Sequence, residues 1–160
     1  MVKTAPSQVI TARQLLEQWQ GHRRLTRRVI EAFPEKELFE HTIGGMRSFA
    51  LMAEEMIKMA GPGVKGIATG IWVNLEWTDQ DYKTKESLLK AWDETTEEIE
   101  EVWNKIPPYR FQDVDTAFGA YEGPLFSTLL YFIDNEVHHR GQGYVYLRSL
   151  GIEPPPFWMR

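Results

Sequence analysis

The residues best suited to chemistry lie in the stretch DNEVHHRGQ at 134–142, which holds two of the four histidines in the chain. Because the sequence contains no cysteine, a metal ion would have to be held by imidazole, carboxylate or amide groups. Side chains four residues apart lie one turn apart on a helix, which suits two ligands of one ion. The stretch offers two such pairs, Asn135 with His139 and Asp134 with His138. It therefore indicates a metal or catalytic site, or else a polar stripe on an ordinary helix.

Helical phase separates these two pairs. Along a helix over 124–150 the apolar residues fall on one broad arc, and His139 lies at the edge of this arc near Phe132. Asn135 lies one turn before His139 on the same stripe. His138 projects to the other side, where we expect it to form a hydrogen bond or to line the mouth of a pocket. Depth therefore favours Asn135 and His139 as the pair that faces the interior.

A third ligand would come from a facing helix, and ALMAEEM at 50–56 offers two adjacent glutamates. Glu55 borders the apolar arc of this segment, whereas Glu54 points outward together with Arg47 and Lys58. Glu55 is therefore the predicted inward carboxylate.

The other titratable residues have simpler interpretations. His22 and His41 are predicted to be a surface and a loop histidine. Arg140 is expected to pair with an acidic neighbour or with a helix C-terminus. Gln142 and Tyr146 lie on the same stripe as His139 and are expected to line the site.

Helices must position these side chains. Apolar residues at helical spacing predict an all-α fold, an up-and-down four-helix bundle, and little of the sequence alternates as a strand would. Prolines and glycines are expected to end the first three helices, at Pro34, at GPG in 61–63 and at Pro107-Pro108. The predicted helices run from about Ser7 to Phe33, from just after Gly45 to Ala60, from Thr84 to Lys105 and from Pro124 to Leu150.

The chain of 160 residues shows no break in composition, so residues 1–160 are expected to form one domain. Two long connections, 61–83 and 106–123, join the predicted helices. Long connections in a compact domain are often functional, and we expect these two to shape a substrate pocket. Within the first, IWVNLEW at 71–77 is expected to form a short extended piece or a lid, with its two tryptophans across one end of the bundle.

Charge and hydropathy exclude several classes of protein. A net charge of −5 argues against nucleic-acid binding, and the one dense basic run, HRRLTRR at 22–28, is too short to change this. The N-terminus does not resemble a signal peptide, and no apolar run of 18 residues could cross a membrane. We therefore expect a cytoplasmic protein with no nucleic-acid or membrane partner.

Two segments carry a resemblance to a known family. HHRGQGYVYLRSLGIEPP at 138–155 resembles the C-terminal hallmark of the DinB-like superfamily of four-helix proteins, which includes the YfiT-type metalloenzymes. GGMRSFALMAEEM at 44–56 resembles the second-helix segment of that superfamily, and the order of elements agrees over essentially the whole chain. The resemblance implies a divalent metal (zinc, nickel or manganese), S-transferase or hydrolase-like chemistry on water or a small thiol, and a homodimer. Exposed aromatic residues of the loops and of the tail PPPFWMR also favour a homodimer.

The metal ligands that the resemblance implies are changed in this sequence. The superfamily uses one histidine on the second helix and two histidines four residues apart on the fourth, and the matching positions here are Glu55, Asn135 and His139. A carboxylate is a competent metal ligand, but a neutral asparagine is a poor one for zinc or nickel. Two functions stay open. One is a metal-dependent enzyme that acts on a small molecule, and the other is a non-catalytic binding or stress-associated bundle with a degenerate site and no metal.

Overall fold

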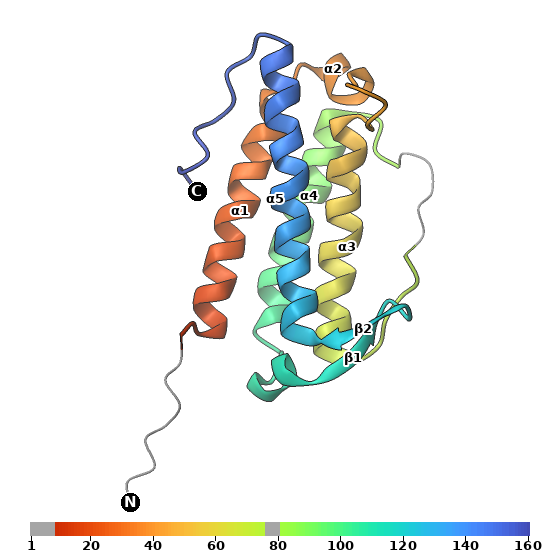
Figure 1. Cartoon of the computed structure of the whole chain (residues 1–160), viewed down its shortest axis with the longest axis vertical. Helices are drawn as coiled ribbons and strands as arrows, with labels where there is room; N and C mark the ends of the chain where they lie inside the picture. Colours follow the sequence, from red (N-terminus) through yellow and green to blue (C-terminus); the bar gives the residue numbers. More distant parts are fainter. Residues whose placement is uncertain (1–8, 76–80) are drawn as a thin grey trace, which may run out of the picture.

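Four long helices form the bundle in the computed structural model, which describes residues 9–75 and 81–160 (Figure 1). The all-α helical bundle predicted from the sequence is confirmed. None of the helices described is long and apolar enough to cross a membrane. The elements in chain order are α1 (Ala12–Ala32), the short α2 (Glu35–Glu40), α3 (Phe49–Thr69), α4 (Lys85–Trp103), the 3-10 helix η1 (Pro108–Gln112), β1 (Val114–Ala117), β2 (Tyr121–Pro124) and α5 (Leu125–Ser149).

Capping residues explain where two of the helices begin. Thr11 and Thr84 each form a capping box, with Gln14 and Ser87 respectively, which satisfies the first free N–H groups of α1 and α4. The predicted start of the first helix at Ser7 was too early, because residues 9–11 are not helical and α1 begins at Ala12, after the capping residue Thr11. The other predicted ends of α1, α4 and α5 agree with the structure within two residues.

The predicted end of the second long helix at Ala60 was wrong, because α3 continues through Pro62 to Thr69. The glycines in this stretch allow close packing. A Cβ atom on Gly63 would lie 2.4 Å from the ring of Phe132, and one on Gly66 would lie 2.2 Å from the ring of Trp72. Packing of aromatic rings against these glycines outweighs their weak helix propensity. The connection that follows therefore begins at Gly70 and not at residue 61.

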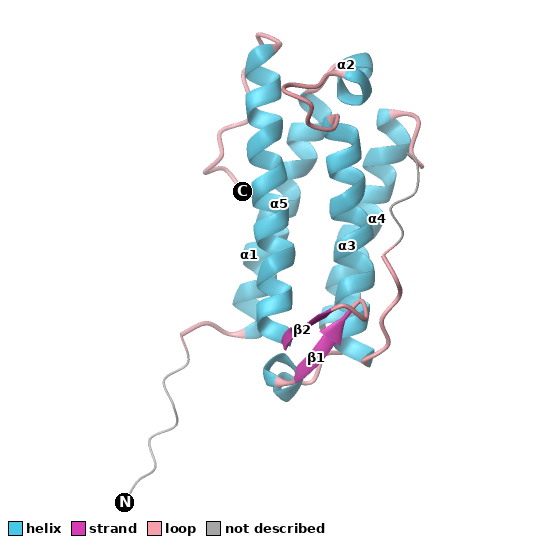
Figure 2. Ribbon diagram, turned by 45° about the vertical axis from the view of Figure 1, so that its right-hand side comes forward, coloured by secondary structure: helices cyan, strands magenta, loops and turns pink. Residues whose placement is uncertain are grey.

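The helices do not follow the expected up-and-down order throughout. Gly61 of α3 lies against Thr95 of α4, and Lys65 one turn later pairs with Glu98, so these two helices run in the same direction. Figures 1 and 2 show the same parallel arrangement. The ends of the connection 70–84 consequently lie at opposite ends of the bundle.

A β-hairpin that the sequence did not predict lies across the end of the bundle where α5 begins (Figure 2). Its strands pair from Val114 with Pro124 to Ala117 with Tyr121. Arg110 fixes the hairpin to α3, because its guanidinium donates to the Ile67 carbonyl and pairs with a strand carboxylate. Strands of four residues are too short to show a clear alternation of apolar and polar side chains.

Trp72 lies at the same end of the bundle, as expected. Its ring packs edge-on against Phe118 of the hairpin, with centroids 5.3 Å apart. The second tryptophan of this stretch, Trp77, lies outside the described residues.

The predicted buried face of α5 was partly wrong. Phe126, Leu130 and Val137 are 40–42% exposed, whereas Glu136 and Arg140 are buried. Apolar residues occur all around this helix, so their spacing does not define one face. The buried charges contribute to a polar layer between two apolar clusters, one at the hairpin end and one at the α2 end.

Candidate functional site

Glu55 on α3 and His139 on α5 lie face to face, as predicted. The His139 Nε2 atom is 3.1 Å from Glu55 Oε1, and the His139 Nδ1 atom is 2.8 Å from Gln142 Oε1. The side chains of His139 and Glu55 are 8% and 15% exposed. Both ring nitrogens of the histidine therefore have side-chain partners in a nearly buried position.

Arg47, which the sequence placed on the outward side with Glu54, is a third member of this cluster. Its Nη2 atom lies 2.5 Å from Glu55 Oε2, so both carboxylate oxygens have partners. Burial raises the pKa of Glu55, but the hydrogen bonds and charges of His139 and Arg47 outweigh burial and lower this pKa to about 2. Glu55 is thus an ionised carboxylate held between two donors.

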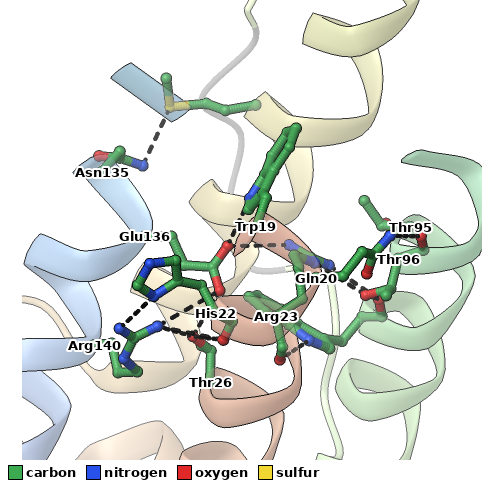
Figure 3. Close-up of polar contacts among 12 residues, drawn as sticks. Trp19, Gln20, His22, Arg23, Thr26, Thr95, Thr96, Asn135, Glu136 and Arg140 are labelled. Carbon is green, nitrogen blue, oxygen red and sulfur yellow. Dashed lines mark hydrogen bonds and ion pairs between the residues drawn. The ribbon is translucent and has the colours of Figure 1, made fainter. Parts of the chain in front are cut away.

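Asn135 lies one turn before His139, as predicted, but its amide has a different partner. The Asn135 Nδ2 atom donates to the Met59 sulfur at 3.6 Å. Figure 3 shows this contact, which lies apart from the buried polar side chains of α1 and α5. Among the described residues, no hydrogen bond joins Asn135 to Glu55 or His139.

These donors fit a resident metal ion poorly. Two ligand atoms that are each about 2.1 Å from one ion lie about 3.0–3.4 Å apart, and the 3.1 Å between His139 Nε2 and Glu55 Oε1 would suit such a pair. However, Asn135 adds only a neutral amide, and the guanidinium of Arg47 occupies the carboxylate as a competing cation. Across residues 9–75 and 81–160, no three His, Asp or Glu side chains are grouped to hold a metal.

Glu54, which was predicted to point outward, is 3% exposed, so that prediction was wrong. Its carboxylate accepts from the Asp81 backbone N–H and pairs with Lys58 at 2.6 Å. This contact joins α3 to the segment before α4. A buried carboxylate needs such partners, and the sequence spacing did not show that a distant backbone N–H would supply one.

The remaining histidines divide between surface and interior. His138 is exposed, and His41 lies after α2 with its Nε2 atom 2.8 Å from the Ser149 hydroxyl. His22 was predicted to be a surface residue, but it is only 5% exposed. Burial, together with the charges of Arg140 and Arg160, lowers the pKa of His22 to about 4.

His22 belongs to a buried polar network between α1 and α5 that is centred on Glu136 (Figure 3). The Glu136 carboxylate accepts from Trp19 Nε1 at 3.1 Å and from the Thr26 hydroxyl at 2.7 Å. Arg140, at 3.9 Å from the same carboxylate, donates to Thr26 and contacts His22 Nδ1 at 2.9 Å. Arg140 therefore has the acidic neighbour expected from the sequence.

The network continues into α4 through Arg23, which is 1% exposed. The Arg23 guanidinium lies 3.6 Å from the ring centroid of Trp92 and donates to the Trp92 carbonyl and the Thr96 hydroxyl. Burial lowers the pKa of Arg23 to about 10, and the charge of Glu136 opposes this shift. The Glu136 carboxylate lies 3.9 Å from Arg23 Nη1 and 3.9 Å from Arg140 Nη1, so its single charge is shared between two buried guanidinium groups. The spacing of Trp19, His22 and Thr26 on one face of α1 was the sequence signal for this network.

A pocket of about 330 Å³ opens beside Glu55 at the hairpin end of the bundle. As expected, both long connections contribute to its wall, through Leu75 and through the hairpin. The aromatic and acidic residues that line it are Glu55, Phe118, Tyr121, Glu122, Tyr131 and Phe132, and the other lining residues are Met59, Leu75, Ala117, Gly123, Ser127 and Thr128.

Comparison with known proteins agrees with this architecture. A DinB-like protein from Bacillus cereus ATCC 10987 has a similar structure, with a TM-score of 0.74 and 17% sequence identity over 91% of this chain and 97% of its own. A DinB-like protein from Bacillus subtilis gives a TM-score of 0.72 and 17% identity over 92% of this chain and 99% of its own. No curated protein matches the sequence. The family model of the DinB family matches residues 1–160, so the chain belongs to the DinB family.

Proposed function

We propose that this DinB family protein binds a small organic cation with an apolar body in the pocket beside Glu55. The observation that supports this most strongly is the composition of the pocket wall. Four aromatic side chains and two carboxylates line it, and none of the described lining residues is basic. Aromatic faces attract cations, and a carboxylate adds a direct ion pair.

The pocket has an apolar floor and a polar mouth. Phe118 and Phe132 are buried, with ring centroids 6.1 Å apart, and form the deep part. Tyr121, Glu122 and Tyr131 are exposed at its opening. This distribution suits a ligand that inserts an apolar group and leaves its charged end near the mouth.

The two carboxylates have different roles in this proposal. Glu55 is already paired with Arg47 and His139, so much of its charge is compensated. Glu122 on the hairpin therefore provides the main attraction for the cation. The pair of Glu55 and His139 joins α3 to α5 and supplies a rigid polar end to the pocket.

Calorimetric titration with two matched probes tests this function. Phenethylamine, which is a cation at neutral pH, should bind more tightly than the neutral 2-phenylethanol. Glu122→Gln should weaken phenethylamine binding about twofold to fivefold and leave 2-phenylethanol unchanged, since only an exposed ion pair is lost. Glu101→Gln removes an exposed carboxylate of α4 outside the pocket and serves as the matched control. Equal affinity for both probes would contradict the proposal.

A second candidate function is a metal-dependent S-transferase or hydrolase-like enzyme. The 3.1 Å separation of His139 Nε2 and Glu55 Oε1 favours it, because this is a distance that two ligands of one ion adopt. Metal analysis of the wild type, Glu55→Ala and His139→Ala after incubation with zinc, nickel and manganese separates the two candidates. Stoichiometric metal in the wild type alone would support the enzyme, and near-zero metal in all three would rule it out.

A further inference from the structure

A second pocket, of about 370 Å³, lies where the C-terminal tail meets α1, and its wall is basic. Arg24, Arg27 and Arg28 of α1 line it together with Met159 and Arg160 of the tail. We propose that this pocket binds a small phosphate-type oxyanion, such as the phosphoryl group of a soluble metabolite.

Contacts of the tail hold Arg160 beside α1. The Tyr144 hydroxyl donates to the Pro155 carbonyl at 2.6 Å, which fixes the tail against α5. A Cβ atom on Gly21 would lie 3.2 Å from Arg160 Cβ and 3.6 Å from Arg24 Nη2. The side chains of Arg24 and Arg160 therefore meet over the same buried glycine.

The positive charge of this pocket is only partly compensated. Arg27 pairs with Asp93 at 2.6 Å and with Glu31. By contrast, no carboxylate in the described part of the chain lies within ion-pair distance of Arg24, Arg28 or Arg160. Arg24 and Arg28 are four residues apart on one helix, where like charges repel each other. An anion between them would remove this repulsion.

The contacts of His22 show that the Arg160 guanidinium has an N–H donor without an acceptor. Its Nδ1 atom faces Arg140 at 2.9 Å and its Nε2 atom faces Arg160 at 3.3 Å. A neutral imidazole accepts at only one nitrogen, so it serves one of these two guanidinium groups and not both. The closer contact belongs to Arg140. The Arg160 guanidinium thus keeps donors for a ligand in the pocket.

The arrangement suits a small oxyanion better than a long polyanion. Guanidinium groups bind phosphate oxygens through paired hydrogen bonds. The three arginines of this pocket that lack a carboxylate partner, Arg24, Arg28 and Arg160, therefore provide several donors. The net charge of −5 and the acidic residues next to Arg27 would repel an extended nucleic acid. The pocket therefore selects for a compact ligand.

Calorimetric titration of the full chain with pyrophosphate at constant ionic strength tests this site. The wild type should bind pyrophosphate saturably, and Arg24→Gln with Arg28→Gln should weaken binding about tenfold or more. The matched control is Arg13→Gln with Lys90→Gln, which removes two positive charges that pair with Glu17, Glu100 and Glu94 elsewhere. This control should bind like the wild type.

Three results would overturn the proposal. One is the lack of saturable binding up to roughly 10 mM pyrophosphate. Another is an equal loss of affinity in the control. The third is tighter binding of a single-stranded oligonucleotide than of pyrophosphate, dependent on Arg24 and Arg28. Since both arginines lie on the outer side of α1, circular dichroism should show both double variants folded.

Discussion

At the scale of single residues, the sequence predicts the contact between Glu55 and His139 but not the contact between Glu55 and Arg47. The pairing of Glu55 with His139 follows from helical phase and from the resemblance to the DinB-like superfamily, and the structure places the two atoms 3.1 Å apart. Arg47 was placed on the outward side together with Glu54 because the helix was expected to begin just after Gly45, but α3 begins at Phe49, so helical phase does not apply to Arg47. The burial of Glu136 was missed for a similar reason, since its partners lie more than 100 positions away in the sequence.

The identity of residue 135 should decide whether the cluster holds a metal. Asn135→His places an imidazole one turn before His139, which gives three strong ligands together with Glu55. We expect this variant to bind zinc at one equivalent, while the wild type binds far less. Zinc analysis after dialysis measures this. Equal amounts of bound zinc in the wild type and in Asn135→His would contradict our conclusion that Glu55, Asn135 and His139 fit a metal ion poorly.

Buried His22 should make stability depend on pH. Its pKa is about 4 in the folded protein and about 6.5 in the unfolded chain, so the unfolded chain binds the proton more readily. Stability from this residue is present above pH 6.5 and is lost as the pH falls toward 4. Between pH 6.5 and 5 we expect the wild type to lose about 1–2 kcal/mol of unfolding free energy relative to His22→Asn.

Urea unfolding at several pH values measures this loss. His138→Asn, which changes an exposed histidine on α5, is the matched control and should follow the wild type. Parallel pH profiles for the wild type and His22→Asn would show that the buried imidazole has no such effect.

At the scale of elements, the sequence predicts the long helices well and the connections poorly. Apolar spacing and helix-ending residues place the C-terminal end of α1 and both ends of α4 and α5 within two residues of the observed ends, whereas α1 begins at Ala12 and not at Ser7. The end of α3 was wrong because glycine and proline are weak helix formers locally but permit close packing of Phe132 and Trp72. Such packing depends on residues far away in the sequence, so local spacing does not show it.

Two glycines should respond in opposite ways to the same substitution. Gly63→Ala would force a Cβ atom to 2.4 Å from the Phe132 ring, so we expect it to lower the unfolding free energy by about 1–3 kcal/mol. Gly141→Ala, on the open side of α5, meets no atom within 4 Å and should raise stability by about 0.5–1 kcal/mol. Chemical denaturation compares the two. A similar effect of both substitutions would contradict the packing described for α3.

At the scale of the whole molecule, α5 bears an exposed apolar stripe that bundle packing does not cover. The stripe consists of Phe126, Leu130 and Val137, which are 40–42% exposed. Exposed apolar patches on small proteins often mark interfaces. We propose that this stripe, together with the aromatic tail, mediates the homodimer expected from the resemblance.

Light scattering at high concentration tests the homodimer. We expect a mass near twice 18.7 kDa for the wild type, and near 18.7 kDa for the variant with Leu130→Glu and Val137→Glu. Charged residues at these positions should separate the copies without disturbing the core, because both side chains point outward. A mass of 18.7 kDa for the wild type would contradict this interface.

The measurement that tests the central claim most directly is a crystal structure of the protein with phenethylamine bound. We predict that the phenyl ring lies against Phe118 and Phe132 and that the ammonium group lies within hydrogen-bonding distance of the Glu122 carboxylate. Density for the ligand elsewhere on the protein, or none in this pocket at a saturating concentration, would contradict the account.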